Sequence, residues 1–468
     1  MKYVWLISIW CMHLVCAAQI KDTLNLEPFE LISSKASSGA GALKINLPLP
    51  YSGSIADVIG SHSALFVKSY SPGNLATSSM RGMGAQHTAV LWNGINLQSV
   101  MNSNLDLNLL PVFFFDHAAI ETGANAASAA NGALAGAIYL NNQPKKLNQT
   151  FGEYLTGSFG LNAISIGSSV YAKNMFLNSK FVRRTARNDF EFVNYFSPQK
   201  PIERLRNSEF TQSGFMQELE WDVNAYNTIY ANYWYMQTER DLPPAMGIAN
   251  TFNEQQDDYS HKFLVKHLAQ LSSKIKLSSQ YAFINEQINY YNDLLLPAFN
   301  DANSHILESQ LNWKLSPQLE FVSSINYTNQ NARTDGYILG KQRHLISLWQ
   351  SINYTSRNKK NRITLGTRQL MVNGEMVPAS PDLGMDIKLN SFLKWKTNLA
   401  AGYRIPSFND LYWQAGGNPN LLPEVSKKLE STLEIFTNGF KLATTAFLHH
   451  VNNWILWTPD PVSQIWRA

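Results

Sequence analysis

Residues that could carry out chemistry are sparse in this chain, and none has a spacing typical of a catalytic site. The sequence contains neither the phosphate-binding pattern GxxxxGKS/T nor the zinc-binding pattern HExxH. His449 and His450 are adjacent, but neighbouring side chains on a strand point to opposite faces, so a shared metal ion is not expected. Asp257-Asp258 lacks the six or more oxygen ligands that calcium takes, which favours a solvated loop. We therefore expect no enzymatic activity, no cofactor and no metal site.

Two glycine-rich stretches superficially suggest nucleotide binding. Gly82-Met83-Gly84 and the run Gly123–Gly136 both lack a strand–loop–helix setting with an acidic residue about 20 positions further on. Leu134 is the only bulky side chain in the second stretch, which instead permits close backbone packing and sharp turns. A dinucleotide site is therefore not expected.

Composition indicates a chain with one apolar and one polar face per strand. Aromatic residues make up 12% and charged residues only 15% of the sequence, while the mean hydropathy is −0.21. This balance is typical of a membrane β-barrel rather than of a helical membrane protein. The formal net charge of +4 is too small to suggest nucleic acid as a partner.

The N-terminal residues predict export from the cytoplasm. Lys2, the apolar run Tyr3–Val15 and the small residues after Cys16 together predict a signal peptide over residues 1–18. Both cysteines, Cys11 and Cys16, lie inside it, so thiol chemistry is excluded for the mature chain. The alternative, a membrane anchor, is disfavoured because the run falls short of about 18 residues.

Residues 19–43 are predicted to be a flexible, polar segment. It carries the acidic-apolar patch Glu27, Pro28, Phe29, Glu30 and Leu31, in which the proline prevents a helix. An extended patch of this kind can add as a strand to the sheet edge of a partner, although a disordered terminus is the alternative interpretation.

Residues 44–145 are predicted to form a small α+β domain. Ser54–Gly60 reads as a capped helix that ends at its glycine. Trp92-Asn93-Gly94-Ile95 is typical of a tight hairpin turn. The strands expected in this domain are Ala64–Ser69, Thr88–Trp92, Ala118–Glu121 and Gly136–Leu140.

From residue 146 onward the sequence alternates with period two. Leu219, Trp221 and Val223, for example, alternate with Glu218 and Glu220. About 15 such strands, many near ten residues or longer, favour a transmembrane antiparallel β-barrel over a soluble sandwich or propeller. We expect short turns, as at Asn438-Gly439, and long polar loops over Thr238–Asp258 and Tyr291–Ser304.

Several ordered motifs make the whole mature chain resemble the TonB-dependent outer-membrane receptors. The hexapeptide Ser79–Gly84 is similar to the "IRG.G" motif of their plug domain, and Tyr403–Tyr412 is similar to a barrel motif that contains "RaPsf". Ser69–Ala76 and Leu91–Asn96 look most like the cobalamin transporters of this family. The remaining matching segments are Ile55–Gly60, Thr88–Ile95, Leu105–Ile120, Gly123–Ile138 and Gly417–Glu424.

This resemblance implies an energy-driven transporter in the bacterial outer membrane. Its ligand would be cobalamin or, as the alternative, an iron-chelating siderophore; a passive channel without energy coupling is a further possibility. Residues 27–31 would be the box that pairs with TonB of the TonB–ExbB–ExbD complex, and a surface lipoprotein that caps the receptor would be another partner. The implied plug core is Arg81, Gly82, Gly94, Gly132 and Gly136. The implied ligand contacts on plug loops are Tyr70, Ser71, Pro72, Gly73, Asn74, Asn96, Gln98 and Asn102.

Two further expectations concern the barrel. Arg81 is the one charge in the central plug motif, and we expect it to pair with a carboxylate inside the barrel such as Glu218 or Glu220. Complete members of the family have 22 strands, so about seven strands are expected to be missing after Ala468.

Overall fold

The computed structural model describes residues 40–50, 52–122, 131–143, 146–244, 253–463 and 465–468, all of which belong to one compact unit. The predicted signal peptide, the patch Glu27–Leu31 and most of the run that begins at Gly123 lie outside these residues. Within the described ranges, no helix has the length and apolar character needed to cross a membrane.

A small sheet forms the centre of the N-terminal part. Its strand order is β1-β6-β7-β4-β5, and β4 and β7 are parallel while the other pairs are antiparallel. The strands are β1 (Leu43–Leu47), β4 (Thr88–Trp92), β5 (Ile95–Asn96), β6 (His117–Thr122) and β7 (Gly136–Asn141). Around it lie α2 (Ile55–His62), the hairpin β2 (Phe66–Ser69) with β3 (Ala76–Ser79), and the short helices η2 (Ala85–His87), η3 (Leu107–Leu109) and η4 (Val112–Phe114). We refer to residues 43–141 as the plug.

The predicted helix and turn are confirmed with one correction. Ser54 caps α2 and forms a reciprocal capping box with Asp57. The helix does not end at Gly60 as predicted, because Gly60 remains helical and the backbone N–H of Ser63 closes the last turn at 3.1 Å. Asn93 and Gly94 have φ values of 47° and 90°, as the tight β4–β5 turn requires.

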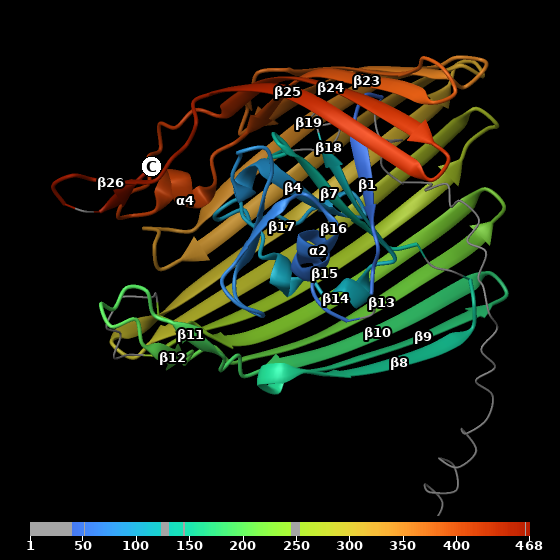
Figure 1. Ribbon diagram of the computed structural model, residues 1–468. Helices are drawn as coiled ribbons and strands as arrows, with labels where there is room; N and C mark the ends of the chain where they lie inside the picture. Colours follow the sequence, from blue (N-terminus) through green and yellow to red (C-terminus); the bar gives the residue numbers. More distant parts are fainter. Residues whose placement is uncertain (1–39, 51, 123–130, 144–145, 245–252, 464) are drawn as a thin grey trace, which may run out of the picture. The chain divides into compact units, whose positions relative to one another are not determined.

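The plug lies against the inner face of a much larger antiparallel sheet (Figure 1). That sheet has 16 strands, of which β21 lies off the main path, so 15 follow one another as the sequence predicted. They are β8 (Gln149–Thr156), β9 (Asn162–Ala172), β10 (Met175–Ala186), β13 (Phe210–Asn224), β14 (Asn227–Asp241), β15 (Glu254–Gln270), β16 (Ile275–Asn292), β17 (Leu295–Lys314), β18 (Leu319–Thr334), β19 (Lys341–Thr355), β20 (Asn361–Val372), β22 (Ser380–Lys388), β23 (Leu393–Arg404), β24 (Glu424–Thr437) and β25 (Phe440–Asn452). The short pieces are β11 (Glu191–Val193), β12 (Ile202–Arg204), β21 (Glu375–Met376), β26 (Thr458–Pro459), β27 (Trp466–Arg467), the helix α4 (Phe408–Tyr412) and η5 (Ser158–Gly160).

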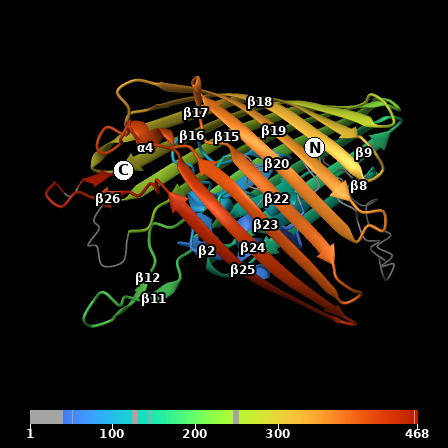
Figure 2. The same cartoon turned by 90° about the horizontal axis from the view of Figure 1, so that it is seen from above.

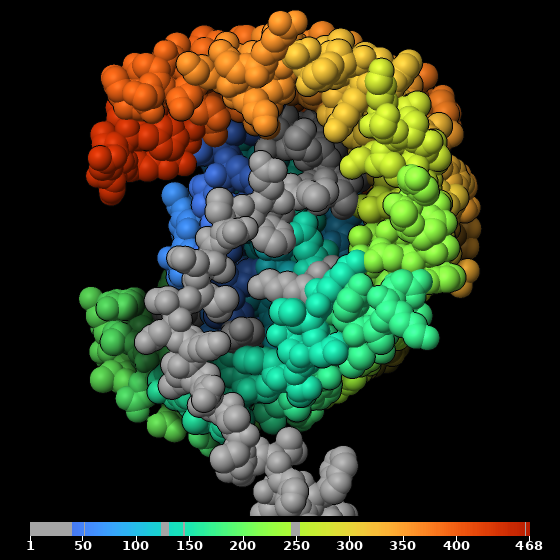
Figure 3. Space-filling view, turned by 90° about the vertical axis from the view of Figure 1, so that its right-hand side faces the viewer, coloured from blue at the N-terminus to red at the C-terminus, as the bar shows by residue number. Residues whose placement is uncertain are grey.

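The alternation along each strand separates an inner from an outer face. Glu218 and Glu220 are buried against the plug, whereas Trp221 is 40% and Val223 38% exposed on the outside. Figure 3 shows the large sheet curving around the plug. No pairing between described residues joins β25 to β8, so these two strands are the edges of the sheet.

The two ends of the large sheet differ in the length of their connections. Long connections, including the β11–β12 hairpin, α4 and the β26–β27 hairpin, all lie at one end, which is the left end in Figure 1. The opposite end carries short turns such as Asn438-Gly439. In outer-membrane barrels the long loops face outward, so we refer to the first end as the outer end. The tilted strands are seen from above in Figure 2.

Two predicted loops are wrong in extent. Residues 291–304 are mostly strand, because β16 and β17 are joined by the two-residue turn Asp293-Leu294. The predicted Thr238–Asp258 loop is wrong at both ends, because β14 extends to Asp241 and β15 begins at Glu254. Strands β14 to β17 extend beyond the part of the sheet that lipid would cover. In that outer part neither face of a strand must be apolar, so a polar sequence is compatible with a strand.

Candidate functional site

Buried polar contacts hold the plug inside the barrel. The first begins at a tight turn, Met80–Met83, in which Arg81 and Gly82 have φ values of 54° and 74°. The turn directs Arg81 at Glu430 of β24, and both guanidinium nitrogens bind the carboxylate, one of them at 2.5 Å from Nη2 to Oε1. The Glu430 side chain is 1% exposed. Phe447 of β25 covers the guanidinium, with 4.8 Å from Cζ to the ring centre.

The predicted partners of Arg81 are therefore wrong. Glu218 lies 3.5 Å from Lys180, and Glu220 lies 3.1 Å from Lys146. Both carboxylates are on β13, which lies far from β24 in strand order. The alternation in the sequence predicts that Glu218 and Glu220 face inward. It does not show which barrel strand lies opposite the plug turn that carries Arg81.

A second contact fixes the plug loop that follows β2. Arg240 of β14 binds Asp106 of the plug at 2.5 Å and Asp258 of β15 at 2.9 Å. Asp106 also accepts the backbone N–H groups of Ala76 and Asn108, each at 2.9 Å. Arg240 thus ties two plug segments to the barrel wall.

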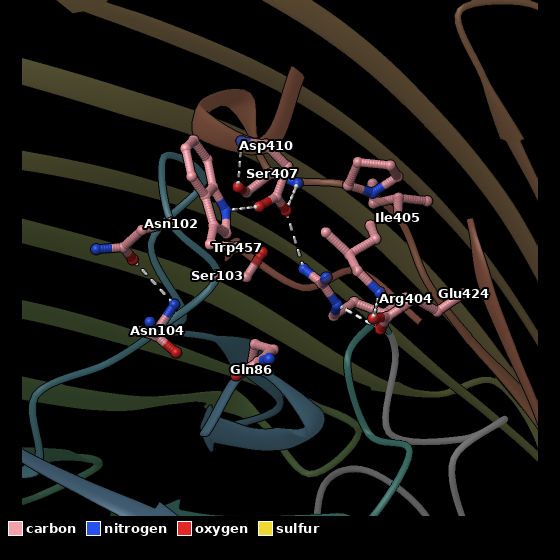
Figure 4. Close-up of polar contacts among 12 residues, drawn as sticks. Gln86, Asn102, Ser103, Asn104, Arg404, Ile405, Ser407, Asp410, Glu424 and Trp457 are labelled. Carbon is pink, nitrogen blue, oxygen red and sulfur yellow. Dashed lines mark hydrogen bonds and ion pairs between the residues drawn. The ribbon is translucent and has the colours of Figure 1, made fainter. Parts of the chain in front are cut away.

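A third contact is a continuous polar chain that runs from the plug to the outer end, and Figure 4 shows its part from Glu424 to Trp457. His87 of η2 lies 2.8 Å from Glu424 at the start of β24, and neither side chain has exposed surface. Arg404, the last residue of β23, binds Glu424 at 2.6 Å and Asp410 of α4 at 3.2 Å. Asp410 in turn accepts the indole N–H of Trp457 at 2.9 Å. The chain therefore connects η2 to three separate segments of the barrel.

The hydrogen bonds of His87 define its protonation. The backbone N–H of Gly84 points at Nδ1 at 3.2 Å, and an N–H can only donate. Nδ1 is therefore the acceptor, the ring proton is on Nε2, and Nε2 donates to Glu424. The ring of Trp454 packs edge-on against the imidazole at 4.9 Å.

Plug and outer loops also meet directly at α4. The backbone N–H groups of Phe408 and Asn409 donate to the carbonyls of Val100 and Met101, at 3.1 Å and 2.8 Å. Tyr337, in the connection between β18 and β19, donates to the side chain of Asn409. Burial, and after it the nearby Asp410 carboxylate, raises the pKa of Tyr337, so its hydroxyl remains a donor.

The predicted ligand contacts fall into two separate loops. Residues 70–74 lie beside Phe210 and Arg240, near the outer ends of β13 and β14. In this loop Tyr70 is 59% exposed and Pro72 is also exposed, whereas Ser71, Gly73 and Asn74 are buried. The second loop contains Asn96, Gln98 and Asn102, and it lies under α4. Asn102 is exposed, while Asn96 and Gln98 are half-buried and hydrogen-bonded within the plug.

The predicted plug glycines occupy the plug interior and its turns. A Cβ atom on Gly136 would lie 2.5 Å from the backbone oxygen of Glu121, so only glycine allows β6 and β7 to approach here. Gly82, Gly94 and Gly132 all have positive φ. Three residues further along β7, burial and then Glu121 raise the pKa of Tyr139 well above its usual range.

Reasoning from sequence missed Arg240, His87 and most of the charged residues on β24. The signal for β24 was present: the alternation of Glu430 and Glu434, followed backward with period two, reaches Lys428 and Glu424. For His87 no local pattern exists. In the part of the chain that the structure describes, no cluster of three or more His, Cys, Asp or Glu residues is placed to hold a metal ion. The arrangement offers hydrogen bonds and ion pairs that can break and re-form.

A curved antiparallel sheet of this size, with a plug anchored to its inner face, is typical of plugged outer-membrane barrels. A family model described as "TonB dependent receptor-like, beta-barrel" matches residues 125–467 of this chain. A second model, "TonB-dependent Receptor Plug Domain", matches residues 49–137. The chain belongs to the TonB-dependent receptor family, whose members are outer-membrane β-barrel proteins.

Two curated relatives are similar over most of this chain. A "Vitamin B12 transporter BtuB" of Vibrio vulnificus is 24% identical over 421 residues, which cover 84% of this chain and 64% of the relative. A protein of the same name from Photobacterium profundum is 22% identical, covering 88% and 66%. The chain thus spans about two thirds of the length of these relatives. The ferric enterobactin receptor PfeA of Pseudomonas aeruginosa has the same fold, with a TM-score of 0.71 at 14% identity over 88% of this chain and 71% of its own.

Proposed function

We propose that this protein takes part in TonB-dependent active transport of a scarce, large ligand across the outer membrane, and that the ligand is cobalamin. The observation that carries the proposal is the polar chain from His87 to Trp457, which links the plug to the outer loops. Ligand bound on the outer loops could act on the plug through this chain. A plug held by such contacts can be released without exposing a large apolar surface.

The interface between plug and barrel supports this mechanism because it is uneven. Near β13–β16 apolar packing surrounds the Arg240–Asp106 pair, and Trp92 packs edge-on against Trp234 of β14 at 5.5 Å. Near β24 the interface consists of the Arg81–Glu430 ion pair and the His87–Glu424 hydrogen bond. Ion pairs can exchange for water, whereas apolar contacts cannot without loss. We therefore expect the plug to loosen first on the β24 side.

Cobalamin is proposed on the names of the two curated relatives, which cover most of this chain. The segment Ser69–Ala76 supports the same choice by its resemblance to that subfamily. A siderophore is the competing ligand, and the structural likeness to PfeA does not decide between them because it concerns the fold alone.

The energy source is proposed to be TonB, bound through residues 27–31. The plug begins with β1, which runs antiparallel to β6 at the edge of the plug sheet. Force applied N-terminal to β1 would peel this edge strand away from β6 before it acts on the rest of the sheet. A residue-by-residue loss of hydrogen bonds needs less force than simultaneous rupture.

Uptake and binding of labelled cobalamin test the proposal. A strain that lacks its own cobalamin receptor should take up the label when it produces this protein together with TonB, and purified protein should bind cobalamin. Uptake that persists after the proton gradient collapses would indicate a passive channel instead. Binding of a ferric siderophore without cobalamin binding would transfer the same mechanism to the competing ligand.

A further inference from the structure

The outer face of the sheet carries a repeated pair of side chains that transport does not use. In each pair a tyrosine hydroxyl lies 2.9–3.0 Å from Nδ1 of a histidine on the neighbouring strand. The histidines are exposed, while residues beside them in sequence, such as Lys262 and Arg343, are buried on the inner face. The pairs are Tyr233–His261, Tyr281–His305 and Tyr327–His344, and we call the three imidazoles the histidine row.

The same geometry recurs on three successive hairpins, β14–β15, β16–β17 and β18–β19. In each hairpin the bonded tyrosine precedes, by two residues, the residue that lies directly opposite the histidine. His261 lies opposite Tyr235 and bonds Tyr233. His305 lies opposite Phe283 and bonds Tyr281. These six strands are consecutive neighbours in the sheet. The pairs therefore recur every second strand, a lateral spacing of about 10 Å.

The histidine row lies at one level of the barrel. His261 is nine residues before the inner end of β15, His305 is nine before that of β17, and His344 is eleven before that of β19. At 3.3 Å per residue and a tilt of about 40°, this level is about 23–28 Å above the short turns. The apolar band of an outer-membrane barrel is about 25 Å tall.

The residues on either side of the row agree with that placement. Below it, the outer face is apolar, as at Phe263, Leu307 and Ile346, which are all exposed. Above it, the same face becomes polar, as at Asn303 and Gln342. The row thus marks the boundary between hydrocarbon and headgroups at the outer end.

The hydrogen bonds leave one ring nitrogen directed away from the protein. In His344 the amide nitrogen of Asn329, which can only donate, also lies 3.1 Å from Nδ1. Nδ1 is therefore an acceptor and Nε2 carries the proton. In the described residues every hydrogen bond to the histidine row is made at Nδ1, and a tyrosine hydroxyl that donates to Nδ1 of His261 and His305 leaves Nε2–H free there as in His344.

Cations extend the row on flanking strands. Arg183 on β10 is exposed on the outer face, eight residues above the start of that strand at Met175. Lys427 on β24 is exposed ten residues before Thr437, the inner end of its strand, and it lies opposite His450. Donors and positive charges at headgroup level complement an anion.

We propose that the histidine row binds the phosphate groups of outer-leaflet lipids. Each Nε2–H donates to a phosphate oxygen, while the paired tyrosine fixes the ring orientation. The about 10 Å spacing lets neighbouring pairs hold neighbouring phosphate groups. This lipid site is separate from the plug and from the proposed transport function.

The test compares lipid retention in the full-length protein and in two triple variants. His261→Phe/His305→Phe/His344→Phe keeps three aromatic rings but removes the donors, and the corresponding His→Gln set keeps polarity without the ring. The matched control, Phe263→Leu/Leu307→Ile/Ile346→Leu, changes the same strands one pleat lower. Each protein is reconstituted in nanodiscs with a phosphorylated glycolipid or its dephosphorylated form, extracted, and analysed by native mass spectrometry. Heat-modifiable mobility on gels confirms that each barrel is folded.

We expect wild type and control to retain the phosphorylated lipid, and the Phe set to retain at least fivefold less. The dephosphorylated lipid should be retained equally weakly by all proteins. Equal retention by wild type and both triple variants would overturn the proposal. Displacement of the lipid by inorganic phosphate, with phosphate bound in the absence of lipid, would also overturn it, because it would define a free-anion site. If the Phe set does not fold, His261→Leu/His305→Leu/His344→Leu, which also lacks the donors, decides by the same criterion.

Discussion

Loss of the Arg81–Glu430 pair should loosen the plug by a calculable amount. In Arg81→Met the Glu430 carboxylate stays buried, with 1% of its side chain exposed. The hydroxyl of Thr122 at 3.4 Å and the electrostatic attraction of Lys428 remain, but neither replaces the two guanidinium hydrogen bonds. Removing one partner of a buried ion pair costs about 3–5 kcal/mol.

Hydrogen exchange of plug amides measures this cost. If opening limits exchange, about 3–5 kcal/mol corresponds to roughly 10²- to 10⁴-fold faster exchange at amides of β4 and β7. The double variant Arg81→Met/Glu430→Gln also removes the unpaired Glu430 charge, so it should exchange more slowly than Arg81→Met alone. Uptake should be impaired in the single variant while the barrel remains folded.

The control is Arg204→Met, which removes an ion pair of an outer loop. Arg204 is 62% exposed and lies 3.5 Å from Asp189, so its loss should change plug exchange little. Plug exchange in Arg81→Met that matches wild type within threefold would refute the reasoning. A double variant that exchanges faster than the single variant would show that buried charge is not the cause.

Three other changes should have distinct effects. Arg240→Met should lower the free energy of opening at the amide of Ala76 by about 2–3 kcal/mol, because Asp106 keeps its two backbone donors; unchanged exchange there would contradict this. Gly136→Ala should destabilise the plug by about 1–3 kcal/mol in thermal unfolding, since the new Cβ would lie 2.5 Å from a backbone oxygen. The control Gly152→Ala, whose Cβ meets nothing within 4 Å, should be neutral. Equal unfolding midpoints for the two variants would contradict this prediction. Deletion of residues 27–31 should abolish uptake and leave ligand binding intact, and loss of binding would refute their assignment as the TonB-binding box.

Local patterns were sufficient wherever neighbours along the chain decide the structure. Ser54 and Asp57 are three residues apart, so the capping box could be predicted without tertiary information. The Asn93-Gly94 turn follows from backbone conformations that few residues adopt. The strand alternation follows because lipid and the plug side impose opposite demands on alternate residues. These patterns explain why the barrel and its strand number could be predicted, whereas the family was predicted from the resemblance of several ordered motifs.

The tertiary structure decided which charges meet. The residues of the His87–Glu424 pair are 337 positions apart in the sequence, and no local pattern connects them. Every second residue of a barrel strand faces inward, so many carboxylates are candidates for Arg81, and only the docked position of the plug selects Glu430. Polar sequence beyond the lipid was misread as loop because alternation disappears where both faces meet water. The sequence by itself therefore determined the architecture, whereas the anchoring of the plug depends on contacts between distant strands that only folding brings together.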